Sequence, residues 1–551
     1  MPAIVTNKFR IHNAKQFVEA FDEVAATSGV AITDTAGLLT TNMYLFIGKV
    51  TAWSDDTAPP TPTDSVANTV YNHWRDMIAA KKIGTTDVSH VVPRYNWTTG
   101  SNYYAYTHAN NALFDQQFYV MTTDYNVYKC IANNNAGGTS TTQPTGTGTA
   151  LIETADTYAW KFMYQISAAR ALKFVTPSYM PTQRVRKANN AIANTTDSSF
   201  QYDVEITANT SGNGAIEACH VTTGGSAYKF EVGTVQSGYT ETTTTCKIVG
   251  TGLAANQIVD NDIYFTNGAL AGTGGTITSY VAGSDLVVTW APATASAPAD
   301  GVAYSIAPKC VITGDGHGAN VRLTNTASGV IGDVVVVAGG NNYGNAVATI
   351  STNTGSSGVV TPMVGPLGGH GSNAIEELGG FFVMVNSRLE YGESGNFTTN
   401  NDFRKIGLVA QPLYSNGDVA VATTIDQCVT ATIQSWNSTA FAEDELVTGA
   451  LSGATGKVVD FKSNTTLRMV DVTMGSNTTV GYDSIAGSFQ ANETITANSV
   501  GTGGSGASSN TSAVAGGDFQ RFSGDVLYVE NRSPVTRADD QIEDVKLIIE
   551  F

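Results

Sequence analysis

Apolar side chains occupy every second position along one segment in the first third of the chain. From Tyr158 to Ile166 an aromatic or aliphatic residue alternates with Ala159, Lys161, Met163 and Gln165. A period of two sustained over a segment of this length indicates a β-strand. Two shorter apolar runs, 118–121 and 127–131, flank the turn-rich segment 122–126. That arrangement predicts a β-hairpin.

Helical spacing of apolar residues occurs twice before residue 80. Asn13 can cap a first helix, with Gln16 as its partner three residues on. The apolar face that follows consists of Phe17, Val18, Phe21 and Val24. Asp64 or Ser65 can cap a second helix, whose apolar face consists of Val66, Val70, Trp74 and Met77. Short strands are expected at 43–50 and at 88–92, so this part of the chain predicts a mixed domain.

Gly, Thr and Val replace the aromatic residues after about residue 200, and an internal repeat appears. The segment 221–228 ends in Gly224-Gly225 and a Tyr, and the segment 336–343 ends in Gly339-Gly340 and a Tyr. In each copy a strand runs into a turn where glycine supplies a positive φ and the Tyr ring folds over it. The repeat predicts a duplicated, all-β domain inserted at 200–380.

A second repeat follows the return of aromatic residues at 381–428. Phe441, Glu445 and Val447 recur with the same spacing at Phe489, Glu493 and Ile495. A Ser-Gly-Ala turn stands downstream of each copy, at 452–454 and at 505–507. We expect a small barrel or sandwich over 429–517, with the Gly- and Ser-rich stretch 500–517 as a flexible exit linker.

The chain is expected to end in two closing strands, 526–529 and 545–549, separated by a turn around Asn531 to Pro534. The predicted fold class is mainly β with a few helices, an α+β core that carries two inserted all-β modules. The core domain would be discontinuous and consist of residues 1–199, 381–428 and 518–551. Inserts of this kind enter at little cost where the ends of a loop lie close together.

Composition narrows the function classes. The chain has 551 residues, of which only 14% are charged, and its net charge is −18. The acidic balance and the absence of basic runs argue against nucleic acid and anionic lipid as partners. No apolar stretch has the length of a membrane span, and residues 1–8 lack the pattern of a secretion signal. The five cysteines are widely spaced, which predicts free buried thiols in a reducing cytoplasm.

Two histidine loops and two acidic pairs are the candidate reactive groups. His317 and His370 lie in Gly-rich loops, but neither has a second ligand at metal spacing nearby, so exposed turns are the expectation. A shared site of the two histidines is the alternative. The pairs 376–377 and 539–540 would point to opposite faces of a strand, so we expect solvated charges. We predict no catalytic, cofactor-binding or metal-binding residues.

Aromatic residues gather between Trp97 and Tyr106. Tyr103, Tyr104 and Tyr106 cannot all face one core. Some are expected to be exposed at a protein interface, and ordinary core packing is the alternative.

Several blocks, in the same order, resemble the baseplate wedge subunit called gene product eight in T-even-type contractile phages. The blocks in the first half are 3–10, 44–48 with Trp53-Ser54, 58–66, 91–94 with Trp97, 127–130 and 156–161. The later blocks are 403–406 with Pro412, 523–534, Asp540-Gln541 and Phe551. The run Ala58-Pro59-Pro60-Thr61-Pro62-Thr63-Asp64 is the most specific element. The two β inserts depart from the compact family pattern.

The resemblance implies a structural role without catalysis or cofactors. The family is a homodimeric, mainly β subunit of the baseplate wedge, assembled in the host cytoplasm and carried in the virion tail. Its partners would be other wedge proteins, with no nucleic acid, no membrane insertion and no small-molecule ligand. Two alternatives are a peripheral receptor- or glycan-binding tail protein and a depolymerase. The first requires an exposed aromatic platform in the inserts, whose tryptophans are Trp290 and Trp436. The second requires a cleft with two opposed carboxylates.

Overall fold

The computed structural model forms two compact units, one made of residues 1–90 and 381–551 and the other of residues 91–380. It describes residues 3–21, 42–48, 52–65, 68–133, 138–186, 199–210, 213–249, 253–281, 285–327, 329–473, 488–498 and 504–551. Strands predominate over helices in both units, and the predicted mainly β, multidomain fold class is confirmed. Val24 and Val66 of the predicted helix faces lie outside the described residues.

A five-stranded sheet at the centre of the first unit draws its strands from both ends of the chain. Its order is β22 (Thr424–Asp426), β2 (Met77–Ile83), β1 (Met43–Gly48), β21 (Asn401–Ala410) and β29 (Asp525–Arg537). Every residue of β1 is buried, as expected for a central strand covered on both faces. Ile47 pairs with Ala79 of β2 on one side and with Ile406 of β21 on the other. Strands β1 and β2 from the first 90 residues are therefore in the same sheet as β29 from the last 30.

Apolar side chains of β1 alternate between two cores. Tyr44 and Phe46 face a cluster with Trp74 of helix α2 (Asn68–Asp76), whereas Leu45 and Ile47 face the opposite cluster. The predicted second helix thus ends before Met77, which is the first residue of β2.

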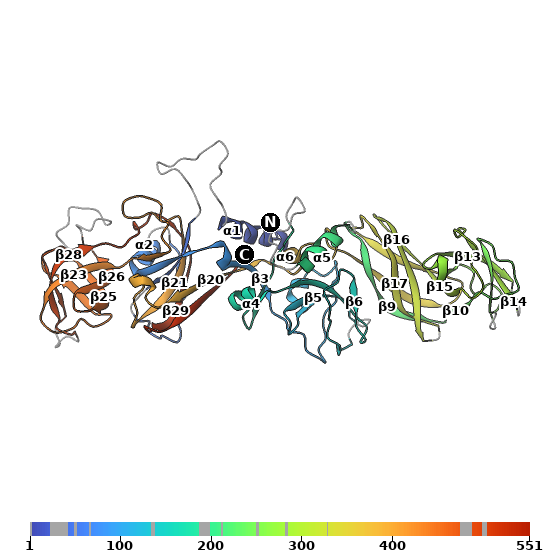
Figure 1. The fold of residues 1–551 in the computed structure, drawn as a ribbon, viewed down its shortest axis with the longest axis horizontal. Coiled ribbons are helices and arrows are strands. Elements are labelled where there is room, and N and C mark those ends of the chain that lie inside the picture. Colours follow the sequence, from blue (N-terminus) through green and yellow to red (C-terminus); the bar gives the residue numbers. More distant parts are fainter. Residues whose placement is uncertain are drawn as a thin grey trace, which may run out of the picture. The chain divides into compact units, whose positions relative to one another are not determined.

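The two chain ends meet in the first unit. Helix α1 (Asn7–Ala20) begins at a Thr6 cap, seven residues before the predicted Asn13 cap, and Thr6 Oγ1 accepts a hydrogen bond from Phe9 N at 3.2 Å. Arg10 of α1 donates to the carbonyl of Phe551 at 2.5 Å and pairs with Glu550. These contacts tie α1 to the end of β30 (Ile542–Glu550), which pairs with β20 (Phe382–Glu390) (Figure 1). Strand β3 (Val88–Pro93) and the short helices η1 (Thr85–Asp87) and η4 (Glu393–Gly395) complete the regular structure around them.

Residues 429–515 of this unit form a closed six-stranded barrel (Figure 1, orange). Around the barrel its strands are β23 (Val429–Trp436), β26 (Thr466–Thr473), β25 (Thr455–Lys462), β24 (Leu446–Gly449), β27 (Thr494–Ala497) and β28 (Ser508–Ala515). The region 508–515 is therefore a barrel strand and not a flexible linker, because Ser509 and Thr511 turn into the barrel and are buried. Small residues suit a strand where the opposite wall is close.

The barrel is an internal duplication. Thr448 of β24 pairs with Thr496 of β27, its counterpart in the Phe-x-x-x-Glu repeat. Asp444 and Asn492, also counterparts, both have a positive φ, of 62° and 61°. A pair of equivalent residues opposite one another in an antiparallel ladder marks a local two-fold axis.

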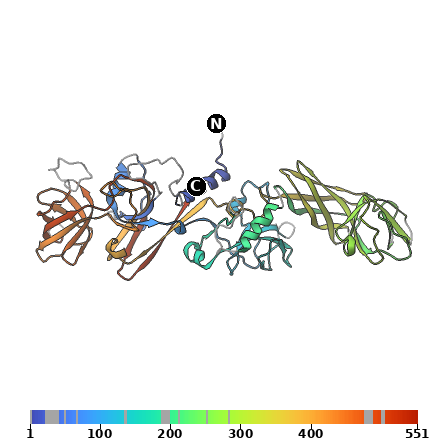
Figure 2. The same ribbon diagram turned by 45° about the horizontal axis from the view of Figure 1, so that its top comes forward.

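A sheet of four strands carries the first part of the second unit. Its strands are β4 (Tyr119–Met121), β5 (Asn126–Asn133), β7 (Tyr158–Gln165) and β6 (Leu151–Glu153), and β4 and β5 form the predicted hairpin. Helix α5 (Ser199–Thr210, the green helix in Figure 2) lies against β7, and its Val204 belongs to the same buried cluster as Trp160. The remaining short elements are η2 (Leu113–Asp115), α4 (Ala168–Phe174), β8 (Tyr179–Pro181) and α6 (Ala374–Glu377).

The Gly-Gly-Tyr repeat forms a second duplicated module in this unit. Its strands are β9 (Ile216–Ser226), β15 (Ala303–Gly314), β16 (His317–Ala327), β17 (Val330–Asn341), β18 (Ala346–Ser351) and β19 (Ser356–Val364). Gly225 and Gly340 share a φ of 61°, and the Tyr that follows each turn is buried. The pairing of His317 with Asn341 recurs as the pairing of Ser356 with Ser226. The two strands that end in Gly-Gly, β9 and β17, therefore have equivalent partners: β9 pairs with β19, and β17 pairs with β16.

Strand β15 joins this module to a further β module. Its second half pairs with β18, while Ala303 to Pro308 pairs with β10 (Glu231–Thr234) and β12 (Asn261–Phe265). The sheet is completed by β13 (Gly274–Val281), β14 (Asp285–Ala291) and β11 (Thr245–Val249), and η3 (Gly268–Leu270) connects two strands. Trp290 is in its core, at 1% exposure.

The compact units divide between His90 and Val91, within β3. One turn differs from the sequence expectation. Strand β29 continues through the expected turn around Asn531 to Pro534, and the chain turns after Arg537. Pro534 is tolerated there because β29 lies at the edge of the sheet, where one side of the strand has no ladder to interrupt.

Candidate functional site

The segment that carries the most specific sequence block is fastened to the edge strand of the core sheet. We call residues 52–65 the strap. Trp53 Nε1 donates to the carbonyl of Arg532 at 2.8 Å, and Asn531 Nδ2 donates to the carbonyl of Pro60 at 2.8 Å. Prolines keep the strap extended and remove backbone donors, so its position depends on contacts from side chains. Besides the two bonds to β29, Asp56 of the strap pairs with Arg404 of β21 at 3.4 Å.

A pocket of about 610 Å³ lies between the strap, helix α2 and the barrel. Among its lining residues the cationic side chains are Arg75, Lys405 and Lys457, and the anionic ones are Asp76 and Asp471. Lys405 pairs with Asp76, and Arg75 pairs with Asp471 of the barrel. The lining therefore carries one more positive than negative charge, on a chain whose net charge is −18.

His73 is the titratable group of this pocket that is shifted most. Burial, and secondarily the charge of Lys405, lower the pKa of His73 to about 4, while Asp64 opposes the shift. The imidazole is therefore neutral near pH 7. Burial raises the pKa of Asp76, and Lys405 offsets part of that shift. The carboxylates are held in ion pairs, so this arrangement favours docking of a negatively charged group over acid–base chemistry.

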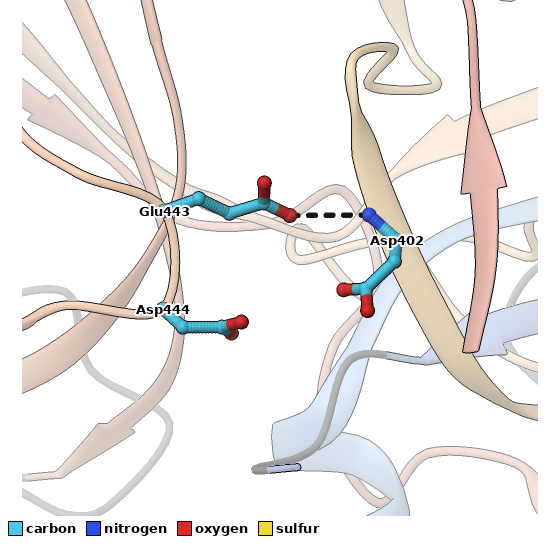
Figure 3. Close-up of side chains that lie close together, drawn as sticks. All are labelled: Asp402, Glu443 and Asp444. Atoms are coloured by element: carbon cyan, nitrogen blue, oxygen red, sulfur yellow. Dashed lines mark hydrogen bonds between the residues drawn. The ribbon is translucent and has the colours of Figure 1, made fainter. Parts of the chain in front are cut away.

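Three acidic residues lie together where β21 meets the barrel. Ligand oxygens of Asp402, Glu443 and Asp444 lie within 4.8 Å of one another, the only such group in the described parts of the chain. Glu443 accepts a hydrogen bond from the backbone N–H of Asp402 at 3.1 Å (Figure 3). Arg404 contacts Asp402 at 2.5 Å. The single guanidinium offsets only part of the charge of the three carboxylates, and the bond from Asp402 N to Glu443 joins the barrel loop to the sheet.

A buried ionic cluster lies in the second unit. Lys129 of β5 pairs with Glu377 of α6, and both side chains are almost fully buried. Glu377 also accepts from the backbone N–H groups of Gly371 at 2.9 Å and Asn373 at 3.1 Å. These bonds fold the loop before α6 back on itself. Sequence analysis missed the pair because its members are 248 positions apart and no local pattern links them.

The two candidate histidines, His317 and His370, differ in burial. His317 is exposed at the start of β16, as expected. His370 is fully buried, contrary to the expected exposed turn, with its ring against Tyr106 at 4.7 Å between centroids. Burial lowers the pKa of His370 well below its usual value. Neither histidine belongs to a group of three metal-ligating side chains among the described residues.

The two acidic pairs also differ in burial. Glu377 is buried, so the expectation of a solvated charge is wrong for that residue, whose partner Lys129 makes burial possible. Asp539 is exposed and accepts hydrogen bonds from Thr399 and Asn400, which fits a solvated turn.

The five cysteines are free and buried, as predicted. Burial raises the pKa of Cys130 and Cys428 well above the usual value. Thiols in that state are poor nucleophiles.

The aromatic cluster divides between core and surface. Tyr103 and Tyr106 are buried, whereas Tyr104 is 55% exposed. No helix in the described part of the chain combines the length and the apolar character needed to cross a membrane.

Comparison with known proteins identifies no relative. No family model matches the chain, and no curated protein sequence matches it.

Proposed function

We propose that this chain is a structural component of a contractile phage tail baseplate. As a wedge subunit, it would join neighbouring wedge proteins and help to hold and transmit the switch that triggers sheath contraction. The proposal starts from the sequence blocks that resemble the gene product eight family. The observation that carries it is the contact between two of those blocks, 58–66 and 523–534, through Pro60 and Asn531.

Further blocks meet in the same sheet. Tyr44 to Gly48 forms β1, which pairs along its length with β21, where the block 403–406 lies. Phe551 accepts from Arg10 of the first block. These blocks, hundreds of residues apart, thus share the first unit, as expected if they belong to a single ancestral core and do not match by chance, while the blocks 91–94, 127–130 and 156–161 lie in the second unit.

The core sheet suits a subunit that transmits force between adjacent subunits of the baseplate. Its strands come from both ends of the chain, so force applied at either end enters a ladder of paired strands. A switch would then move such subunits as rigid bodies and redistribute the contacts between them. We propose a homodimer as the assembly state and other wedge proteins as further partners, with interfaces on the order of 2,000 Å² or more.

The pocket between strap and barrel gives a place for one such contact. Its surplus positive charge favours an acidic segment of a neighbouring subunit. Charged rims of this kind act on association rate and orientation more than on affinity.

The proposal is tested in a contractile-tailed phage that encodes the chain. Amber mutation of its gene should give particles without an assembled baseplate, and the wild-type chain supplied in trans should restore it. Gold-labelled antibody against the chain should mark the end of the tail distal to the head. Complete baseplates in the absence of the chain, or label on the head alone, would overturn the proposal.

A structural variant sharpens the test. Asn531→Ala with Trp53→Phe removes the two bonds that join the strap to β29, and the matched control is Asn416→Ala, a change in an exposed turn. Failure of the strap variant alone to restore baseplates is the expected result. The dimer is checked by sedimentation equilibrium, where twice the chain mass of 57.7 kDa is expected.

A further inference from the structure

A second pocket, of about 620 Å³, lies within the second unit and has a different chemistry. One wall is the tyrosine loop, which we define as residues 102–107, with Asn133 beside it. The other wall is the face of β9 and β19 that presents His220, Thr222 and Thr361. The volume falls within the range typical of small-molecule sites.

The tyrosine loop is held like an extra strand. Tyr104 N donates to the carbonyl of Gln117 at 3.0 Å, and Tyr106 N donates to the carbonyl of Cys130 at 2.8 Å. Asn133 Nδ2 donates to the carbonyl of Tyr103 at 3.1 Å. A site fixed by its own backbone loses little entropy when a ligand binds.

The two walls are also tied to each other. Val364 N, in β19, donates to His108 Nδ1 at 3.3 Å. Burial lowers the pKa of His108, which keeps the accepting imidazole neutral near pH 7. The loop and the strand face therefore form one preformed pocket.

Among the described residues that line this pocket none has a charged side chain, although the chain is strongly acidic. Burial also lowers the pKa of His220, so its imidazole is neutral near pH 7. A charged ligand would lose hydration here without gaining a counter-ion. The lining therefore selects an uncharged molecule.

The open ring and the hydroxyl groups narrow the ligand further. Tyr103 and Tyr106 are buried in the loop, so Tyr104, at 55% exposure, offers the available ring face. Opposite it, the hydroxyls of Thr222 and Thr361 lie 3.0 Å apart, with the His220 imidazole beside them. A sugar ring has an apolar C–H face and a rim of hydroxyls that both donate and accept, which matches this pairing of groups.

We propose that this pocket binds a neutral saccharide unit, with the sugar ring stacked on Tyr104 and its hydroxyls bonded by Thr222, Thr361 and His220. The tryptophans of the inserts do not form the aromatic platform that glycan binding was expected to need, because Trp290 is buried and Trp436 packs against Phe461 at 5.5 Å. The platform is instead supplied by the loop before β4. The proposal is independent of the wedge function.

The test uses the full-length chain and saturation-transfer difference NMR. The probes are the methyl glycosides of glucose, galactose and N-acetylglucosamine, their disaccharides, and glucuronic acid as the charged comparison. At least one neutral sugar should show saturation transfer, with a Kd on the order of 1 mM for a single unit. A gain on going from the monosaccharide to the disaccharide would indicate an oligosaccharide as the natural source, and equal binding a free sugar.

Variants separate stacking from general stability. Tyr104→Ala should weaken binding at least tenfold, Tyr104→Phe should keep it within twofold, and Thr361→Val should weaken it severalfold. Tyr239→Ala, another partly exposed tyrosine outside the pocket, is the matched control and should change nothing. The proposal is overturned if no neutral sugar binds at 10 mM, if glucuronic acid binds better, or if Tyr104→Ala binds like the wild type.

Discussion

The barrel depends on an exchange of glutamates between its two repeats, and Glu493→Gln should expose that dependence. The Glu493 carboxylate, at 1% exposure, accepts from Leu451 N and Ser452 N at 3.0 Å each and from the Ser452 hydroxyl. It also accepts from Gln490 N in its own loop. The glutamate of the second repeat thus caps the Ser-Gly-Ala turn of the first.

Glu445 completes the exchange in the other direction. Its carboxylate accepts from Ser505 N at 2.5 Å and from Ser505 Oγ at 2.7 Å, in the turn of the second repeat. Ala442 N is its local donor, at 3.0 Å. Each repeat therefore holds the other closed through one buried carboxylate.

The expected loss of unfolding free energy follows from the hydrogen bonds that Glu493 accepts. An amide in place of the Glu493 carboxylate keeps one acceptor oxygen, removes the charge from about three hydrogen bonds and turns an N–H group toward a donor. Charge assistance adds roughly 1 kcal/mol per bond, and a buried donor without a partner costs about 1–3 kcal/mol. The loss should be about 4 kcal/mol, and that for Glu445→Gln about 2 kcal/mol, because Glu445 is more exposed, at 9%.

Hydrogen exchange followed by mass spectrometry localises the effect. Amides of the barrel strands should exchange about a thousandfold faster in Glu493→Gln, since each 1.4 kcal/mol is a factor of ten. Amides of β1 should be unchanged. Gln434→Glu is the matched control, because it exchanges the same two groups at an exposed position of the barrel strand β23. Equal protection in Glu493→Gln and in the control would refute the mutual capping.

Three further changes test other parts of the structure. Lys129→Met leaves Glu377 buried without its partner, so urea unfolding should show a loss of about 3–5 kcal/mol, most of which Glu377→Gln should restore in the double variant. The pKa of His73 is lowered to about 4 in the folded chain, so its contribution to stability is full above pH 6.5 and is lost as pH falls toward 4. Replacing His73 with Gln should therefore flatten the decline in unfolding free energy between pH 7 and 4.5, by at most about 3 kcal/mol, and an unchanged slope would contradict the shift. Trp53→Phe removes the hydrogen bond to the Arg532 carbonyl, so thermal unfolding should report a loss of about 1 kcal/mol, whereas no loss would mean that the strap is held elsewhere.

Local patterns in the sequence predicted those elements whose packing is decided locally. The alternation over 158–166 predicted β7, because period two is the geometry of a strand, although Lys161 and Met163 on its other face are buried as well. The Phe-x-x-x-Glu repeat located the barrel, since the same spacing produces the same turn in both copies. The exchange of caps was not predictable, because Glu493 has an acceptable partner, Gln490 N, within its own copy.

Features that depend on residues far apart in the chain could not be predicted from the sequence. Gly-Gly-His-Gly predicts an exposed turn, yet His370 is buried because glycine lets the chain approach α5 closely. A Cβ at Gly369 would lie 2.6 Å from the carbonyl oxygen of Ala208. The pocket of the tyrosine loop was equally hidden. Its aromatic ring was noted, but the facing hydroxyls of Thr222 and Thr361 come from strands more than 100 residues downstream.

The inserted modules share one way of joining the rest of the chain. The barrel begins and ends in paired strands, with Thr430 opposite Ala515. The Gly-Gly-Tyr module begins and ends in β9 and β19, with Ile216 opposite Val364, and the module beyond it is entered at Thr234 opposite Ala303. When the first and last strands of an inserted module pair with each other, its two ends are already close together. The insert then adds little to the entropy cost of closing a loop in the core domain. This explains how a chain of 551 residues can enlarge twice by duplication while β1, from its first part, and β29, from its last part, remain in one sheet.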